Sequence, residues 1–157
     1  MHLRPMKVLM VCLGNICRSP MAEGVLRHLA NEHGAYIEVD SAGTSNYHVG
    51  DAPDHRAQAT TAKHGMDISD LRGRQLTTAD LDRFDVVLVM DKENLRNTLA
   101  LATTPSQARK VCLIMDHAPD HPSREVPDPY YGGDEGFEAV HSMLMEACNN
   151  LLADVAR

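Results

Sequence analysis

The chain has 157 residues, of which 43% are hydrophobic and 24% are charged, and its net charge at pH 7 is −7. These values predict one globular domain over residues 1–157 and argue against nucleic acid as a partner, because no basic stripe is present to neutralise phosphates. No apolar run approaches the roughly 20 residues that cross a bilayer or forms a signal peptide, so we expect a cytoplasmic protein with no membrane partner and with reduced cysteines.

The first predicted strand and the first predicted helix enclose a short loop. Residues 7–11 form a short apolar run, which predicts a buried strand. Ser19 followed by Pro20 predicts the start of a helix with Ser19 as its N-cap, and Gly34 predicts its end. The loop at residues 12–18 therefore joins the end of a strand to the N-terminus of a helix.

The rest of the chain continues the alternation of strands and helices. The other predicted strands are residues 36–41, 85–90 and 111–115. The other predicted helices are residues 53–64, a short helix after a capping box at Thr77 and Asp80, one capped by Asp91, and residues 134–155. Residues 116–133 form a loop with four prolines, long enough to indicate a function. This alternation predicts an α/β fold whose parallel sheet binds ligands at the carboxyl ends of its strands.

The loop after the first strand contains Cys12 and, six residues later, Arg18. Its backbone amides and the following helix N-terminus can bind an anion, and Gly14 and Asn15 tolerate the left-handed conformations that such a loop needs. We expect Cys12 to be a thiolate nucleophile, Arg18 to bind two phosphate oxygens, and Ser19 to donate to the sulfur. The predicted phosphate-binding residues are Leu13, Gly14, Asn15, Ile16, Cys17, Arg18 and Ser19. The Cys–Arg spacing alone is a weak signal and leaves open a buried, inert Cys beside a surface Arg.

If the loop binds a phosphate ester, attack of Cys12 on an ester of a phenol would also need an acid, since the parent pKa of a tyrosine phenol is about 10. Asp128 is the candidate, because two prolines restrict the backbone around it. Tyr130 and Tyr131 follow it and are expected to wall a slot for an aromatic ring. Spacing alone favours the alternative that Asp128 is a solvated residue in a Pro-rich turn.

Metal chemistry is not expected. His117 and His121 have the spacing of metal ligands, but Pro119 and Pro122 would break the helix that aligns them. The four cysteines include no Cys-x-x-Cys pair, which argues against a structural zinc site. We therefore predict that the protein uses no metal and no other cofactor.

Residues 11–20 and the Asp-Pro-Tyr-Tyr segment at residues 128–131 strongly resemble the low-molecular-weight protein tyrosine phosphatases. The resemblance covers nearly the whole chain, and the two motifs lie far apart in it. Further matching segments are Asp40-Ser41-Ala42-Gly43-Thr44, Pro53-Asp54-His55-Arg56-Ala57, Arg74-Gln75-Leu76 and Met90-Asp91. The resemblance implies a flavodoxin-like three-layer sandwich, with a four-stranded parallel sheet and helices on both faces.

The resemblance also implies roles for single residues. It implies Cys12 as nucleophile, Arg18 as phosphate ligand, and Asp128 as acid in the first step and base in the second. Residues that would brace the phosphate loop are Asn15, Ser19 and Ser41. Residues that would line the substrate slot are Leu13, Ile16, Tyr47, Tyr130 and Tyr131. Many members carry a His where Leu71 stands, so the bracing network is expected to be shorter here.

The predicted function is therefore hydrolysis of phosphotyrosine-containing proteins through a phosphocysteine intermediate, by a monomer or weak dimer. An arsenate reductase would need further cysteines to relay a disulfide, whereas Cys112 and Cys148 fall on a predicted strand and a predicted helix. Protein arginine phosphatases of this family typically have Thr in place of Ile16 and lack the pair Tyr130 and Tyr131. A phosphocysteine phosphocarrier, the alternative that is not an enzyme, would have no use for an acid.

The loop also predicts a redox-sensitive cysteine. Cys17 lies five residues after Cys12, and a loop that curls around one phosphate is expected to bring the two sulfurs near each other. An accessible thiolate is readily oxidised. We predict that mild peroxide inactivates the protein through a Cys12–Cys17 disulfide that thiols reverse. The alternative is that Cys17 only fills space beneath the loop.

Overall fold

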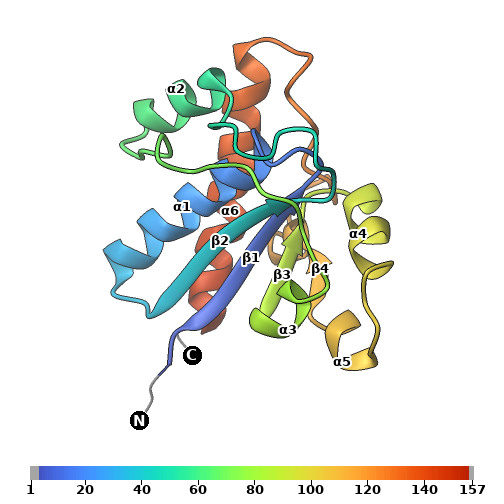
Figure 1. The fold of residues 1–157 in the computed structure, drawn as a ribbon. Coiled ribbons are helices and arrows are strands. Elements are labelled where there is room, and N and C mark those ends of the chain that lie inside the picture. The colour runs from blue at the N-terminus through green and yellow to red at the C-terminus, as the bar shows by residue number, and fades with distance from the viewer. Residues whose placement is uncertain (1–3, 156–157) are drawn as a thin grey trace.

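Four parallel strands form the middle layer of the fold, in the spatial order β2-β1-β3-β4 (Figure 1). The computed structural model describes residues 4–155. The strands are β1 (Met6–Cys12), β2 (Ile37–Gly43), β3 (Val86–Val89) and β4 (Val111–Leu113). This order is that of flavodoxin-like sheets and confirms the predicted fold class. Because β1 lies between β2 and β3, its carboxyl end is the switch point at which such sheets bind ligands.

Helices cover both faces of the sheet (Figure 1). On one side lie α1 (Arg18–His33), α2 (His55–Lys63) and α6 (Asp134–Val155), and on the other lie α3 (Asp80–Arg83), α4 (Lys92–Leu99) and α5 (Pro105–Ala108). Side chains of β1 alternate between the two layers: Val8 and Met10 join one apolar cluster, and Leu9 and Val11 join the other. A central parallel strand is apolar on both faces for this reason. No helix within residues 4–155 is long and apolar enough to cross a membrane.

Helix α1 begins two residues earlier than predicted, with Cys17 as its N-cap and no capping hydrogen bond from that side chain. The Ser19 hydroxyl lies 3.0 Å from Cys12 Sγ and accepts a hydrogen bond from Asn15 Nδ2 at 2.7 Å. The predicted N-cap role of Ser19 is therefore wrong, because partners within the preceding loop engage its hydroxyl. Gly34 ends the helix with φ at 65°, as predicted.

Other element limits differ by a few residues from those predicted. The helix predicted over residues 53–64 begins at His55, because Asp54 is its N-cap and accepts from the backbone N–H of Arg56. The strand predicted over residues 111–115 ends at Leu113, where the 3-10 helix η1 (Ile114–His117) begins. Helix α5 lies outside the predicted elements. Asp91 caps α4 as predicted.

Candidate active site

The loop between β1 and α1 leaves the sheet at its switch point and curls around Cys12. Asn15 has φ at 60°, the left-handed conformation that Asn tolerates better than most residues. This turn points the backbone N–H of Asn15 at Cys12 Sγ, 3.3 Å away. The sulfur is also 3.0 Å from Ser19 Oγ, and either atom of that pair can donate. The sulfur of the predicted nucleophile thus lies within hydrogen-bond distance of one backbone amide and one hydroxyl.

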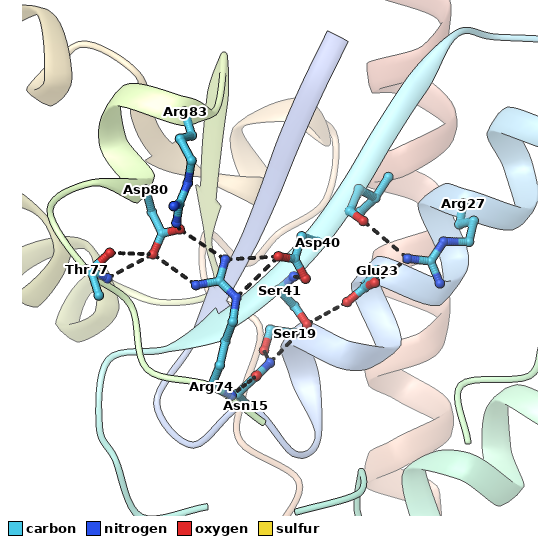
Figure 2. A network of polar contacts seen from close by, with 11 residues as sticks. Asn15, Ser19, Glu23, Arg27, Asp40, Ser41, Arg74, Thr77, Asp80 and Arg83 are labelled. Carbon is cyan, nitrogen blue, oxygen red and sulfur yellow. Dashed lines mark hydrogen bonds and ion pairs between the residues drawn. The ribbon is translucent and has the colours of Figure 1, made fainter. Parts of the chain in front are cut away.

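The side chain of Asn15 joins the loop to neighbouring elements (Figure 2). Its Nδ2 donates to Ser19 Oγ at 2.7 Å and to Ser41 Oγ at 3.0 Å, and its Oδ1 accepts from the backbone N–H of Arg74 at 3.0 Å. The Ser41 hydroxyl in turn donates to Glu23 Oε1 at 2.7 Å. The three bracing residues predicted from the sequence therefore lie in one network, and that network includes Glu23 and Arg74 as well.

Glu23 is buried in helix α1 at the end of this network. Burial raises the pKa of its carboxyl, and its hydrogen bond from Ser41 and its ion pair with Arg27 only partly offset that effect. Leu71 is partly buried and packs against the apolar core next to α1. The Leu71 side chain takes no part in the hydrogen-bond network. The network instead continues from Glu23 to Arg27, which also donates to the carbonyl of Val39 on β2.

Arg74 is braced by two carboxylates (Figure 2). Its Nη2 lies 3.0 Å from Asp40 Oδ2 and 3.1 Å from Asp80 Oδ1. Burial raises the pKa of Asp80, but hydrogen bonds from Arg74, from the N–H of Thr77 and from Arg83 outweigh burial and hold it below its usual value. The bond from the Thr77 N–H is one half of the predicted capping box.

Arg18 is 3% exposed and lies beside the loop with its guanidinium engaged by two oxygens. Its Nη1 donates to Asp91 Oδ2 at 2.6 Å and to the Val126 carbonyl at 3.0 Å. Burial disfavours the charge, but Cys12 and Asp91 keep the pKa of Arg18 above its usual value. Its Nη2 remains directed to Asp128, whose Oδ2 lies 3.9 Å away.

A pocket opens over Cys12. Its lining residues are Cys12, Leu13, Gly14, Ile16, Cys17, Arg18, Tyr47, His48, Asp128, Tyr130 and Tyr131. The three predicted catalytic side chains and all five predicted slot residues therefore line one cavity. Tyr130 and Tyr131 meet edge to face, with ring centroids 5.0 Å apart, which gives the rim an aromatic wall. His48 also lines the pocket and is absent from the predicted set.

The other cysteines and the histidine pair lie elsewhere. All four cysteines are free, and Cys112 and Cys148 lie outside the pocket, on β4 and α6. Burial raises the pKa of Cys148 to about 12. Within residues 4–155 no group of three or more His, Cys, Asp or Glu is placed to hold a metal ion. His121 instead accepts from the backbone N–H of Ser123.

Several residues of the site escaped the predicted set. His48 follows Tyr47 and lines the pocket, whereas the others form hydrogen bonds to predicted residues from other parts of the chain: Glu23, Arg56, Arg74 and Asp91. Arg56, Arg74 and Asp91 fall within segments that the family resemblance marks, which is a signal that could have included them. Glu23 and His48 carry no such signal.

Comparisons with known proteins identify the family and agree with the fold. The family model described as low molecular weight phosphotyrosine protein phosphatase matches residues 7–157. A Synechocystis protein assigned to the low molecular weight protein-tyrosine-phosphatases is 47% identical, over 97% of this chain and 98% of its own. A protein tyrosine phosphatase from Entamoeba histolytica superposes with a TM-score of 0.92 at 37% identity, covering 96% of this chain and 97% of its own. A Drosophila arginine phosphatase superposes with a TM-score of 0.91 at 35% identity, covering 97% and 99%.

Proposed function

The chain belongs to the low molecular weight phosphotyrosine protein phosphatases, and from that membership we propose that it hydrolyses phosphotyrosine in proteins through a phosphocysteine on Cys12. Members of this family are hydrolases, so the protein is an enzyme that cleaves phosphoric monoesters. The observation that carries the residue assignment is the convergence of Cys12, Arg18 and Asp128 on one pocket with an aromatic wall.

The first chemical step transfers the phosphoryl group to sulfur. The Cys12 thiolate attacks phosphorus in line with the tyrosine oxygen, and the P–O bond breaks. Asp128 gives its proton to the departing oxygen, while Arg18 and the loop amides bind the equatorial oxygens. Of the two terminal guanidinium nitrogens of Arg18, Nη2 is the one that faces the pocket, because Nη1 donates to Asp91 and to the carbonyl of Val126.

The second step returns the enzyme to its starting state. The Asp128 carboxylate takes a proton from water, and that water attacks phosphorus. The P–S bond breaks and inorganic phosphate is released. The Ser19 hydroxyl, 3.0 Å from the sulfur, stabilises the thiolate that leaves.

Rates on peptides that carry phosphotyrosine, phosphoserine or phosphoarginine test this proposal. Phosphotyrosine should be by far the best substrate. Cys12→Ser should abolish turnover and leave the fold intact, and Asp128→Ala should slow phosphotyrosine on the order of 10²–10⁴-fold. Turnover near the wild-type rate in Cys12→Ser would reject the mechanism.

Arginine phosphatase activity is the second candidate, because a solved Drosophila arginine phosphatase has the same fold. Ile16 and the tyrosine pair at the rim favour an aromatic substrate. A faster rate on phosphoarginine than on phosphotyrosine would select this alternative. Arsenate reduction is disfavoured, because Cys112 and Cys148 lie outside the pocket.

The proposal extends to the compartment, the partners and the redox control of the protein. We expect action in the cytoplasm on phosphotyrosine-containing proteins, as a monomer or weak dimer, with no nucleic acid or membrane partner; the net charge of −7 supports the absence of nucleic acid.

We also expect peroxide to oxidise the Cys12 thiolate to a sulfenic acid, which Cys17 then attacks with release of water. Burial holds the pKa of the Cys17 thiol well above its usual range, so disulfide formation should be slow. If Cys17→Ser recovers from peroxide as fully as wild type after thiol is added, Cys17 has no such role.

A further inference from the structure

The residues that open α2 connect the loop of the nucleophile to the loop of the acid. The backbone N–H of Asp54 donates to the carbonyl of Ile16, in the loop that surrounds Cys12, at 2.8 Å. Two residues later, Arg56 Nη2 donates to the carbonyl of Tyr130 at 2.9 Å and its Nη1 to the carbonyl of Gly132 at 3.3 Å. A segment of three residues thus contacts both loops.

Arg56 is held in one orientation by its neighbours. Asp54 accepts from Arg56 Nε and Nη2, each at 3.1 Å, and also from its backbone N–H at 2.8 Å. The guanidinium carbon lies 4.8 Å from the ring centroid of Phe137, which is fully buried at the start of α6. Burial raises the pKa of Asp54, but the hydrogen bonds from Arg56 outweigh it and lower that pKa. Such a planar fork needs arginine, since lysine offers a single nitrogen.

The contact with Tyr130 leads directly to Asp128. The backbone N–H of Tyr130 donates to Asp128 Oδ1 at 3.0 Å, while the carbonyl of the same residue accepts from Arg56. With Oδ1 held in this way, Oδ2 lies 3.9 Å from Arg18 Nη2, in the pocket over Cys12. The Asp128 side chain is 40% exposed, so packing alone does not fix its direction. Among residues 4–155, the hydrogen bonds that reach the carbonyls of residues 127–132 from outside that segment come from Arg56.

We propose that Arg56, held by Asp54, is a positioning residue for proton transfer. Through the backbone of Tyr130 it keeps the carboxyl of Asp128 aligned with the leaving oxygen of the substrate. This inference rests on the proposed function, in which Asp128 is the acid. It predicts that the loss of Arg56 weakens acid catalysis specifically and leaves phosphate binding at Cys12 and Arg18 intact.

The test compares aryl phosphates whose leaving groups differ in their need for a proton. Arg56→Met puts an apolar group of similar length next to Phe137 and removes the bonds to both carbonyls. Its kcat/KM on phenyl phosphate should fall about 10–100-fold, because a displacement of about 1 Å can cost this much. Its kcat/KM on 2,4-dinitrophenyl phosphate, whose leaving group departs without a proton, and its inhibition constant for inorganic phosphate should stay near wild type. Arg56→Lys keeps the charge without the fork and should lose an intermediate amount on phenyl phosphate.

A double-mutant cycle with Asp128→Asn separates this role from a general effect on the fold. In the Asp128→Asn background, Arg56→Met should cause no further loss on phenyl phosphate, because the group that it positions is already absent. The matched control Arg109→Met, an exposed arginine at the end of α5, should change neither substrate.

The possible outcomes are distinct. Equal losses on both aryl phosphates, or losses that add in the Asp128→Asn background, would overturn the inference about Arg56 and leave the acid assignment standing. If Asp128→Asn alone slows both substrates equally, the acid assignment of the proposed function fails, and this inference fails with it. If Arg56→Met does not fold, the same criteria apply to Arg56→Lys, which must show the same dependence on leaving group.

Discussion

Asp91 has two partners that one substitution can separate. Its Oδ1 accepts from the backbone N–H of Asn94 at 2.7 Å and caps α4, and its Oδ2 accepts from Arg18 Nη1 at 2.6 Å. Asp91→Asn retains an oxygen for the cap, because Asn is as good an N-cap as Asp, but it removes the negative charge next to Arg18. The effect of that charge can therefore be measured without unwinding the helix.

The expected loss of stability follows from the burial of the pair. Arg18 is 3% exposed and Asp91 is 23% exposed, so the ion pair is only partly screened by solvent. A hydrogen bond between charged groups contributes about 1.5–3 kcal/mol, and we expect Asp91→Asn to lower the free energy of unfolding by about 2 kcal/mol. For a chain of this size that loss corresponds to roughly 4–8 °C in Tm.

Bound phosphate should reduce this difference. A phosphate dianion in the pocket supplies a negative charge to Arg18, which is the charge that the variant lacks. Saturating phosphate should therefore stabilise Asp91→Asn more than wild type. By linkage, each 1.4 kcal/mol by which the difference shrinks requires about tenfold tighter binding of phosphate to the variant.

The assay is urea unfolding in buffer without phosphate and again with saturating phosphate. Glu93→Gln, the same acid-to-amide change at an exposed position of α4, is the matched control and should stay within about 0.5 kcal/mol of wild type. Equal midpoints for Asp91→Asn and wild type without phosphate would refute the role of the pair. A difference that phosphate leaves unchanged would refute the proposed exchange of charge.

Three further predictions follow from individual contacts. Ser19→Ala removes the hydroxyl beside Cys12 Sγ; kcat should fall about tenfold, with phosphocysteine accumulating in rapid-quench experiments, and unchanged turnover would contradict the role of Ser19 in the second step. Gly43→Ala would place a Cβ 2.8 Å from the carbonyl oxygen of Leu13; it should raise KM and lower the free energy of unfolding in urea by about 1–3 kcal/mol, and an unchanged urea midpoint would contradict this. Burial lowers the pKa of His141 from 6.5 to about 4, so the unfolded chain takes up a proton at higher pH than the folded one. Between pH 6.5 and 4 the free energy of unfolding of the wild type should therefore fall by up to about 3 kcal/mol relative to that of His141→Phe. Parallel pH profiles for the two proteins would contradict this last prediction.

The wrong prediction that Ser19 is the N-cap of α1 shows what short-range sequence signals cannot predict. Ser followed by Pro is a valid signal for a helix start, and the helix does begin within two residues of it. The Ser19 hydroxyl could form hydrogen bonds either with backbone amides of its own helix or with groups of the preceding loop. It bonds to Asn15 and Cys12, because the loop folds back over it. The short-range signal identified the helix and could not identify the partner.

The additional partners of the site share a physical origin. Arg18 meets Asp91 across 73 positions, and Asn15 meets the backbone of Arg74 across 59. These contacts depend on which strands are neighbours, since Asp91 follows β3 and Ser41 lies on β2, on either side of β1. The spacing of apolar residues predicts where a strand lies in the chain but not which strand it pairs with. Spacing alone could therefore not have predicted that Arg18 contacts Asp91 or that Asn15 contacts Arg74.

Local patterns in the amino-acid sequence were enough to predict the alternation of strands and helices and the loop with Cys12 and Arg18 after the first strand, because these features depend on hydrogen bonds and burial within a few residues. Its motifs also led to the prediction of Asp128, in a proline-rich loop far along the chain, as the acid. The contacts that hold the Asp128 side chain became visible only in the folded structure. Asp128 accepts a hydrogen bond from the backbone N–H of Tyr130, and the carbonyl of Tyr130 accepts one from Arg56, 74 positions away, because the packing of α2 against α6 brings the two segments together. The direction of an exposed carboxyl is set by such contacts, and they exist only once the layers of the fold have assembled.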